Sequence, residues 1–476
     1  MSAPLIWIGL PLMLAVFLLL LPRERLVTAL GTVSALLLTG IAYWLPPDTT
    51  QRLGSLSLRI EPSLTLLGRQ ITLDAGDQTL LMLVYGTAAF WFFGTFAVGQ
   101  ARQIVALGMA IIALLMASLA VRPFLYSALF IQVAVLMSVP LLASAKIKEK
   151  AHGSAAQPSV RGLLRFLISQ TLGMPFILLA GFLLSGIEAG PADVAQVIQA
   201  SLLLLLGFAF LLAVFPLNTW LPLLAEETSP YTVGFLLTML STFGLVLALN
   251  FIDRFSWLRN STQLPTVLQF IGILTLVTAG VWAAFQRHLA RIAAYGLLAE
   301  IGVSLLAISL PDRQIGLQIL FSLLLPRTLA LGIWTMSINI LQTQTGDLRF
   351  AAVQGLVRRY PLATAGVIFS NLSLAGTPLL AAFPFRQTLW ERLALQSFPL
   401  AFWFGIASLG LWLIALRTLA VLTMSPDNVE WNSQETWPQR ILLSIGLLAL
   451  FLLGSFPQLA QPVLTSLPTM FEFLGK

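Results

Sequence analysis

Long apolar segments follow one another along almost the whole chain, separated by short polar stretches. A helix that crosses the hydrocarbon core of a membrane needs about 20 predominantly apolar residues. By this criterion the sequence predicts an all-α polytopic membrane protein with about 14 transmembrane helices. The predicted spans are Leu5–Leu21, Leu26–Leu45, Thr79–Val98, Ile104–Ala120, Leu125–Ala143, Leu163–Leu184, Val197–Phe215, Thr232–Ile252, Val267–Ala284, Ile292–Leu310, Leu317–Leu341, Ala363–Phe383, Phe398–Thr423 and Ile441–Phe456.

The connections between these spans are short, so the sequence predicts no large domain outside the membrane. The longest connection runs from Pro46 to Gln78. Leu56, Leu58 and Ile60 alternate with other residues in it, which predicts a small β-hairpin.

Several prolines fall inside or at the ends of the predicted spans. Proline removes a backbone donor, and an interrupted helix is tolerated at membrane depth only where protein or a water-filled cavity satisfies the freed groups. Any single proline is equally compatible with a packed kink, but several together predict broken helices of the kind found in transporters. These residues are Pro175, Pro216, Pro326 and Pro378.

Composition supports the membrane interpretation, with 58% hydrophobic and only 9% charged residues. Soluble domains carry about 25% charged residues, so a soluble enzyme is excluded. The chain has no cysteine and only two histidines, His152 and His288, which excludes cysteine-ligated clusters and multi-histidine metal sites. No Gly-x-Gly-x-x-Gly motif follows a strand, so no NADH or flavin site is expected. We therefore expect this chain to bind no cofactor or metal.

Basic residues predict the orientation in the membrane. An even number of spans places both termini on one side, and placing them outside puts the more basic connections in the cytoplasm, as the positive-inside rule requires. The net charge of +7 therefore indicates a membrane surface, and nucleic acid is not an expected partner. The expected cytoplasmic residues are Arg23, Arg25, Lys146, Lys148, Lys150, Arg161, Arg165, Arg287, Arg291, Arg349, Arg358 and Arg359. His152 is expected to be solvated in one of these loops.

Four charged residues fall within or just after apolar spans, where a charge is costly and therefore a candidate for function. Glu300 and Arg327 lie far from any predicted helix end, so the sequence predicts that they form a buried pair, either a proton relay or a structural ion pair. Arg386 and Arg417 could instead extend to the membrane boundary. His288, beside Arg287 and Arg291, is either a solvated histidine or a group that takes up protons.

Three stretches together resemble the antiporter-like membrane subunits of the complex I (NADH–quinone oxidoreductase) and multi-subunit cation/proton antiporter superfamily. The first resembles the family's Pro-x-His-x-Trp-Leu-Pro run and acidic loop, the second its Gln-x-Asp-Leu-Lys-Arg-Leu-Leu-Ala-Tyr run, and the third its Gly-Leu-x-Arg-x-x-Pro and Ala-Gly-x-Pro series. They are Phe215 to Pro222 with Glu226 to Pro230, Ala283 to Tyr295, and Gly355 to Pro361 with Leu374 to Arg386.

The resemblance implies two inverted helical repeats and a chain of buried carboxylates and amines along which protons move. It implies three regions: N-terminal helices with the hairpin at 1–123, a proton-channel core at 124–423, and a C-terminal loop and helix at 424–476. It also implies other membrane subunits as partners, coupling to electron transport and quinone chemistry in a parent complex, and an energy-transducing membrane such as a plasma, inner or thylakoid membrane.

The chain departs from the family at the residues that carry protons. The family's glutamate of the fifth span falls at Gln132, and its lysines of the seventh and eighth spans fall near Leu211 and near Ser241 or Thr242. None of these titrates. Acid and base are missing together, which avoids an unpaired buried charge.

In the second repeat, the family's later lysines fall at Arg327 and Arg386, and arginine does not release its proton. The proton-path candidates are therefore Glu300, Arg327, Arg386, Arg287, His288 and Arg291. The sequence leaves three functions open: a subunit that still moves protons, a structural or adaptor subunit that does not, and an unrelated secondary transporter of a small solute.

Overall fold

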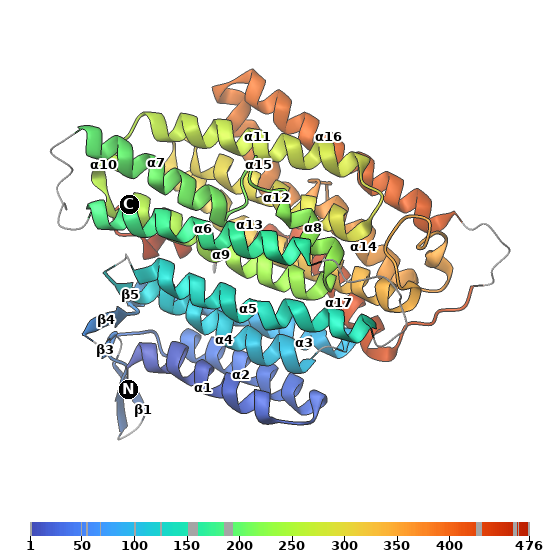
Figure 1. The fold of residues 1–476 in the computed structure, drawn as a ribbon, viewed down its shortest axis with the longest axis horizontal. Helices are drawn as coiled ribbons and strands as arrows, with labels where there is room; N and C mark the ends of the chain where they lie inside the picture. The colour runs from blue at the N-terminus through green and yellow to red at the C-terminus, as the bar shows by residue number, and fades with distance from the viewer. Residues whose placement is uncertain are drawn as a thin grey trace.

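The computed structural model describes residues 2–48, 50–53, 56–66, 68–99, 101–123, 126–150, 160–184, 194–424, 431–459, 464 and 466–474. This part of the chain is almost entirely helical (Figure 1). Ten of its helices are long and apolar enough to cross a membrane. They are α2 (Glu24–Trp44), α3 (Gln78–Val98), α4 (Ala101–Ala120), α6 (Arg161–Leu184), α9 (Pro230–Arg254), α11 (Gln263–Phe285), α12 (Leu289–Ile308), α13 (Arg313–Thr345), α16 (Phe398–Thr423) and α17 (Trp437–Ser455).

Shorter helices complete the bundle. Four of them contain apolar stretches of 10–17 residues in the described part of the chain: α1 (Leu10–Leu20, continuing a π-helical turn at Leu5–Gly9), α5 (Ser127–Lys150), α7 (Val194–Leu211) and α14 (Pro361–Leu374). The remaining α-helices described are α8 (Trp220–Glu227), α10 (Ser256–Arg259) and α15 (Phe383–Gln396).

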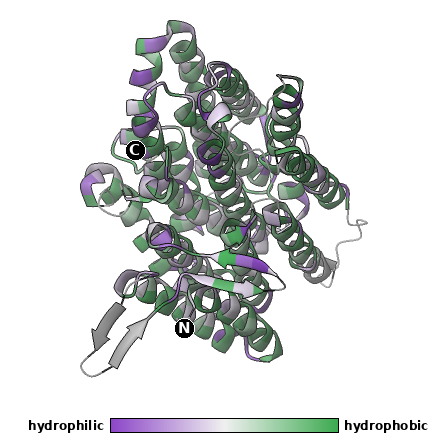
Figure 2. Cartoon of the chain, turned by 90° about the vertical axis from the view of Figure 1, so that its left-hand side faces the viewer, coloured by the Kyte–Doolittle hydropathy of each residue, from purple (hydrophilic) through white to green (hydrophobic). Residues whose placement is uncertain are grey.

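The helices differ in how much of their surface the rest of the chain covers. Within the apolar stretch of 18 residues that could cross the membrane, 89% of the residues are buried in α9 and in α13, but only 22% in α17. The outer helices still expose large apolar side chains, such as Leu20, Phe182 and Leu395. Hydrophobic residues accordingly dominate the helices inside and outside alike (Figure 2). An apolar exterior of this kind requires lipid or other membrane helices as its surroundings.

The connection from Pro46 to Gln78 forms two β-hairpins. Strand β1 (Thr50–Leu53) pairs antiparallel with β2 (Leu56–Arg59), and β3 (Ser63–Leu66) pairs with β4 (Arg69–Thr72), which also pairs with the short β5 (Val121–Arg122). Both chain ends lie at the same end of the bundle as these hairpins (Figure 1). Ser2 bridges Glu61, and Ser466 hydrogen-bonds Thr79 at 2.8 Å.

Two of the predicted spans are interrupted. The spans predicted at Val197–Phe215 and Ala363–Phe383 are too long, because α7 ends at Leu211 and α14 ends at Leu374. Residues with positive φ follow each end: Ala213 at 54°, Gly376 at 80° and Leu379 at 68°. The chain resumes as α8 after the first interruption and as α15 after the second. In contrast, α6 and α13 continue through their internal prolines, Pro175 and Pro326.

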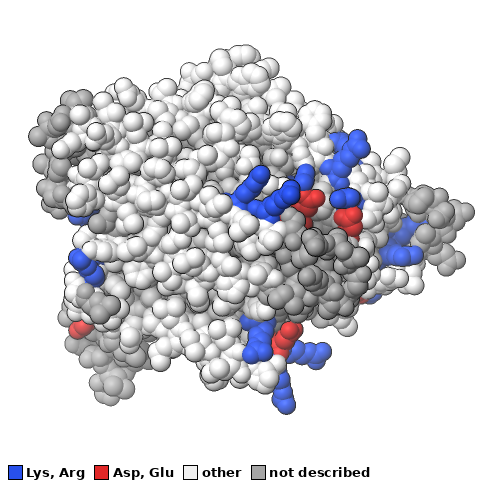
Figure 3. Space-filling model, in the orientation of Figure 1, with Lys and Arg blue, Asp and Glu red and all other residues white. Residues whose placement is uncertain are grey.

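Charged side chains lie at the ends of the helices. On the face drawn in Figure 3, most lysine and arginine lie between the middle and the end opposite the termini, and few lie in the half nearer the termini. Arg23 and Arg25 between α1 and α2, Arg161 at the start of α6, and Arg287 before α12 belong to this end. The side chains of Lys146, Lys148 and Lys150, and the whole of His152, lie outside the described residues.

Candidate functional site: a buried charged centre

The centre of the second half of the bundle contains an ion pair between α12 and α15. Oε1 of Glu300 accepts a hydrogen bond from Nη2 of Arg386, and the two side chains are only 1% and 2% exposed. The prediction that Glu300 pairs with Arg327 is therefore wrong. The alternative that Arg386 extends to the membrane boundary is wrong as well, because its guanidinium is directed into the protein.

Arg327 lies close to this pair and is held by hydroxyl groups. Its Nη2 donates to Oγ1 of Thr242 on α9 at 2.9 Å, and its Nη1 lies 3.4 Å from Oγ of Ser304 on α12. Ser304 in turn donates to the backbone oxygen of Glu300 at 2.7 Å. Three charged side chains from α12, α13 and α15 thus meet in the interior and carry a net charge of +1 when Glu300 is ionised.

The interruption after α14 gives Arg386 its position. Arg386 lies in the first turns of α15, and Gly376 lies in the interruption with a φ of 80°. A Cβ added to Gly376 would lie 3.3 Å from Cδ of Arg386. The stem of the arginine therefore packs against the bare backbone at the point where the helix is broken. Because glycine has no Cβ, it permits both the positive φ and this close approach.

Several buried polar atoms near this centre have no protein partner among the described residues. They are Nε and Nη1 of Arg386, Nε of Arg327, both polar side-chain atoms of Asn371, and the hydroxyls of Ser370 and Ser373. Buried donors and acceptors of this kind are usually satisfied by ordered water. The centre and the C-terminal end of α14 are thus suited to hold water next to a titratable carboxylate.

The first half of the bundle is different. Nε2 of Gln132 donates to Oγ1 of Thr171 at 2.9 Å, and Leu211 is buried at the end of α7. The backbone oxygen of Leu211 accepts a hydrogen bond from Nε2 of Gln170 at 3.2 Å. Gln170 thus satisfies a carbonyl that the interruption frees, a role that the sequence analysis missed because only the three-dimensional structure shows where α7 ends.

Thr242, in the first half of the bundle, accepts a hydrogen bond from Arg327, a cation of the second half. The resemblance places a lysine near this position, and here the guanidinium of Arg327 reaches it from α13. The contacts of Thr242 and Ser304 were not predicted from the sequence, although Glu300 and Ser304, four residues apart, lie on one helix face. Thr242 also donates to the backbone oxygen of Thr238 at 2.8 Å.

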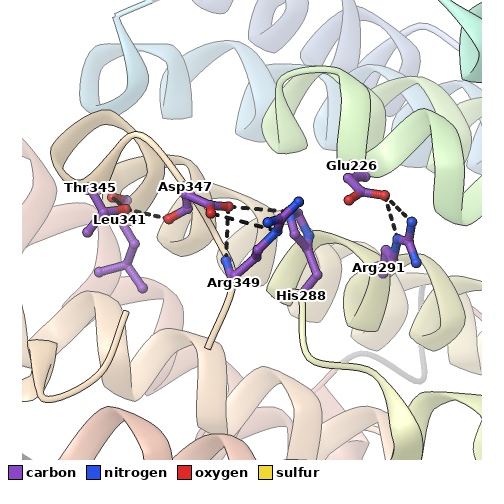
Figure 4. A network of polar contacts seen from close by, with 7 residues as sticks. All are labelled: Glu226, His288, Arg291, Leu341, Thr345, Asp347 and Arg349. Carbon is purple, nitrogen blue, oxygen red and sulfur yellow. Dashed lines mark hydrogen bonds and ion pairs between the residues drawn. The ribbon is translucent and has the colours of Figure 1, made fainter. Parts of the chain in front are cut away.

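A second polar cluster lies at the basic end of the bundle (Figure 4). Nε of Arg291 donates to Oε2 of Glu226 at 2.6 Å. Nε2 of His288 lies 3.9 Å from Oδ1 of Asp347, and the backbones of His288 and Arg349 form a β-bridge. The cluster therefore joins the segments before α12 and after α13 to α8.

His288 is largely removed from water, so the interpretation as a solvated histidine is wrong. Its side chain is 12% exposed. Burial lowers the pKa of His288 below its ordinary value of 6.5, while the charges of Glu226 and Asp347 oppose the shift and those of Arg291 and Arg349 add to it. His288 is thus mainly neutral at neutral pH and can accept a proton. Arg287 beside it is exposed.

Arg417 belongs to the same end of the molecule and is not part of the buried centre. Its Nη1 donates to the backbone oxygen of Ala284, close to the end of α11, and its guanidinium lies 5.9 Å from the ring of Phe350. The alternative that this arginine reaches the membrane boundary therefore fits Arg417, in contrast to Arg386.

These observations define a polytopic membrane protein with broken helices and a buried charged centre. Within the described residues, no group of three or more His, Asp or Glu side chains could hold a metal ion. Residues 164–411, about half of the chain, match the family of NADH:quinone oxidoreductase/Mrp antiporter transmembrane proteins. The chain belongs to this family.

Individual comparisons agree with this assignment. NADH-quinone oxidoreductase subunit N 2 of Acidobacterium capsulatum is 25% identical over 83% of this chain and 85% of its own length. A chain of respiratory complex I from Thermus thermophilus has the same fold, with a TM-score of 0.76, 19% identity and coverage of 98% of this chain and 99% of its own. A chain of the Mrp complex from Dietzia sp. superposes with a TM-score of 0.82 at 16% identity, covering 99% of this chain and 97% of its own.

Proposed function

We propose that this chain is a membrane-arm subunit of a complex I-type assembly and takes part in proton translocation coupled to electron transport. The observation that carries the proposal is the Glu300–Arg386 pair beside Arg327, buried at a helix interruption. Family membership gives the class of assembly, and the subunit N relative from Acidobacterium indicates an NADH–quinone type. Other membrane subunits and the lipid bilayer are its expected partners.

Glu300 is the proton carrier in this proposal. A buried carboxylate exchanges protons when the balance between burial and a neighbouring cation changes, whereas the guanidinium groups of Arg327 and Arg386 remain charged. The arginines would therefore act as fixed charges that set how readily Glu300 is protonated. We expect no redox group on this chain, so electron transfer would occur in other subunits.

The cluster of Arg287, His288 and Arg291 is the proposed site of proton uptake. His288 directly precedes α12, and Glu300 lies twelve positions after it on that helix, which corresponds to about 18 Å along the helix axis. Water molecules would have to carry a proton over this distance, since side chains alone do not bridge it. The buried polar atoms without protein partners near Arg386 support hydration at the inner end of such a path.

The proposal includes about 14 crossings arranged as two inverted repeats, with both termini outside. The ten long helices and four shorter apolar helices of the described chain support the number. The interruptions after α7 and α14, one in each half, support the repeat. The arginines at the end opposite the termini support the orientation, with the parent complex in a plasma, inner or thylakoid membrane.

One observation favours a second candidate, a structural or adaptor subunit that does not translocate protons. In the first half, Gln132, Leu211 and Thr242 occupy the positions of the proton-carrying residues that the resemblance implies, and none of them titrates. Such a subunit would keep the Glu300–Arg386 pair as a structural contact. The two candidates therefore differ in what happens when the charge of Glu300 is removed.

Glu300→Gln in the intact parent complex separates them. Proton pumping is measured in native membrane vesicles with a pH-sensitive dye, alongside electron-transfer rate and the amount of assembled complex. Pumping is expressed per assembled complex, because the variant is expected to lose stability. Loss of pumping per assembled complex supports translocation through Glu300, whereas unchanged pumping per complex supports the adaptor. Glu391→Gln, an exposed carboxylate on α15, is the matched control. Glu300→Asp, which keeps the charge, shows whether a defect comes from the charge or from the packing.

The assignment to a complex has its own test. The tagged chain is purified from its native membrane in mild detergent, and the chains that accompany it are identified by mass spectrometry. Recovery of complex I-type membrane and peripheral subunits supports the proposal. Recovery of the chain alone contradicts it and favours a solute transporter.

A further inference from the structure

A hollow with a basic rim lies at the end of the bundle that carries the termini. The ends of four membrane helices, α9, α11, α12 and α13, surround it together with the C-terminal segment. The hollow is shallow, since its volume of about 450 Å³ includes open space in front of the lining. The lining is aliphatic apart from two arginines, and its apolar members include Ile252, Leu264, Leu268, Ile308 and Leu474.

The two polar residues of the lining are Arg259 and Arg313. They lie next to each other, because Nη2 of Arg313 donates to the backbone oxygen of Arg259. Arg259 also donates to the backbone oxygen of Asp253, and its guanidinium lies 4.5 Å from the centre of the Phe473 ring. Neither guanidinium has a carboxylate partner among the residues that the structure describes. Two neighbouring positive charges therefore face an apolar hollow.

Asp253, whose backbone oxygen accepts from Arg259, uses its carboxylate to bind backbone N–H groups. Its carboxylate accepts hydrogen bonds from the N–H groups of Glu472, Phe473 and Leu474 at 3.1, 2.9 and 2.7 Å. These bonds hold Leu474 in the wall of the hollow and Phe473 against Arg259. The carboxylate thus holds the C-terminal segment at the hollow, and its hydrogen bonds go to backbone N–H groups and not to the two guanidinium groups.

The position of the site identifies the medium it faces. All four helix ends belong to segments long and apolar enough to cross a membrane, so the hollow lies at the boundary between hydrocarbon and headgroups. Phe255 and Trp257, in the same connection between α9 and α11 as Arg259, pack against each other with ring centres 6.2 Å apart, and tryptophan is typical of this boundary. Figure 1 shows α10, which carries Arg259, at the same end as the C-terminus.

We propose that this hollow binds an anionic phospholipid, independently of whether the chain moves protons. The headgroup phosphate would lie between the guanidinium groups of Arg259 and Arg313, which can each offer several N–H donors to phosphate oxygens. Part of one acyl chain would lie against the aliphatic side chains that line the hollow. A free phosphate ion does not account for the aliphatic lining, and a zwitterionic lipid gains less from two cations. Basic pockets between membrane helices bind anionic headgroups in this way.

The test is native mass spectrometry of the full chain purified in detergent, with phosphatidylglycerol or phosphatidylcholine added at equal concentration. We expect the wild type to retain phosphatidylglycerol in preference. Arg259→Gln combined with Arg313→Gln should lower the ratio of bound phosphatidylglycerol to phosphatidylcholine about tenfold, because each interfacial arginine contributes on the order of a fewfold in affinity. Arg69→Gln, an exposed arginine on β4 at the same end, should leave the ratio unchanged.

Two outcomes overturn the proposal. One is an equal preference for both lipids in the wild type, and the other is an unchanged ratio in the double variant. The thermal unfolding midpoint is recorded for every variant, and Arg313→Gln alone, at an exposed residue, tests the same ratio if the double variant does not fold. Inorganic phosphate is added in a parallel series. Displacement of the lipid by phosphate at millimolar concentration would show that the site recognises the anion without the acyl chain.

Discussion

Glu300 on α12 and Arg386 on α15 form an ion pair that is almost completely shielded from solvent, at 1% and 2% exposure. They are 86 residues apart in the sequence. They meet because α14 ends at Leu374 and the chain begins a new helix, α15, at Phe383. Arg327 adds a second cation close to the pair. In the proposed function, proton exchange at Glu300 would depend on how this one carboxylate is balanced against two guanidinium groups.

Removing one partner of this pair is expected to destabilise the protein strongly. Glu300→Gln leaves two buried guanidinium groups without a carboxylate, which costs about 3–5 kcal/mol. Arg386→Met should cost less, because Arg327 still lies close to Glu300. The double variant Glu300→Gln with Arg386→Met should recover most of the loss, because neither charge remains. The free energy of unfolding is measured by denaturant titration in detergent micelles for the two single variants and the double variant.

An exposed position calibrates this measurement. Glu391→Gln on α15 should change stability by no more than about 0.5 kcal/mol. Single variants that behave like Glu391→Gln would show that water reaches the pair, and the description of Glu300 as a shielded carboxylate would then be wrong.

Much of the fold could be predicted from the sequence, because apolar runs of about 20 residues are a direct consequence of the thickness of the membrane. The ends of α7 and α14 could not be placed, since hydrophobicity does not distinguish a helix from an apolar turn. Gly376 and Pro378 indicated an interruption, but the positive φ of Leu379 had no signal in the sequence. In contrast, the burial of Glu300 could be predicted, because apolar residues flank it on both sides in the sequence.

The partner of Glu300 could not be predicted, because partners depend on contacts between helices. Arg327 was the nearer candidate in the sequence, at 27 positions from Glu300 against 86 for Arg386. It points instead to the hydroxyl of Thr242. His288 was misjudged for the same reason: its burial comes from the segment after α13, which folds over it and brings Asp347 within 3.9 Å.

His288 is expected to make stability depend on pH. Since burial lowers its pKa below 6.5, the folded protein binds fewer protons than the unfolded chain between the lowered pKa and 6.5. The contribution of neutral His288 is therefore fully present above pH 6.5 and declines as the pH falls below this value. The groups that face it are Glu226, Asp347, Arg291 and Arg349.

The measurement is the thermal unfolding midpoint of the detergent-solubilised protein at several values of pH between about 7.5 and 5. His288→Gln removes the titration, so the midpoint of the variant should fall less on acidification than that of the wild type. Parallel pH profiles of the two proteins would contradict this prediction, because carboxylates common to both would then account for the whole effect.

Gly376→Ala should be destabilising and should disturb the charged centre. Its φ of 80° is unfavourable for alanine, and the new Cβ would lie 3.3 Å from Cδ of Arg386. We expect a loss of about 1–3 kcal/mol. Gly405→Ala on α16 is the matched control, because nothing lies within 4 Å of its added Cβ, and alanine favours a helix by about 0.5–1 kcal/mol. Equal stability of the two variants would exclude a special backbone requirement at Gly376.

Asp253→Ala should release the C-terminal segment without unfolding the bundle. The carboxylate accepts three backbone N–H groups from Glu472, Phe473 and Leu474, and hydrogen bonds to a charged group contribute about 1.5–3 kcal/mol. Hydrogen–deuterium exchange of the C-terminal peptide should accelerate, while peptides from α9 outside its last turn remain protected. Asp312→Asn is the control, since asparagine caps the start of α13 as well as aspartate does. If exchange at residues 472–474 is as slow in Asp253→Ala as in the wild type, the segment is held by packing of Phe473 on Arg259 and not by the carboxylate.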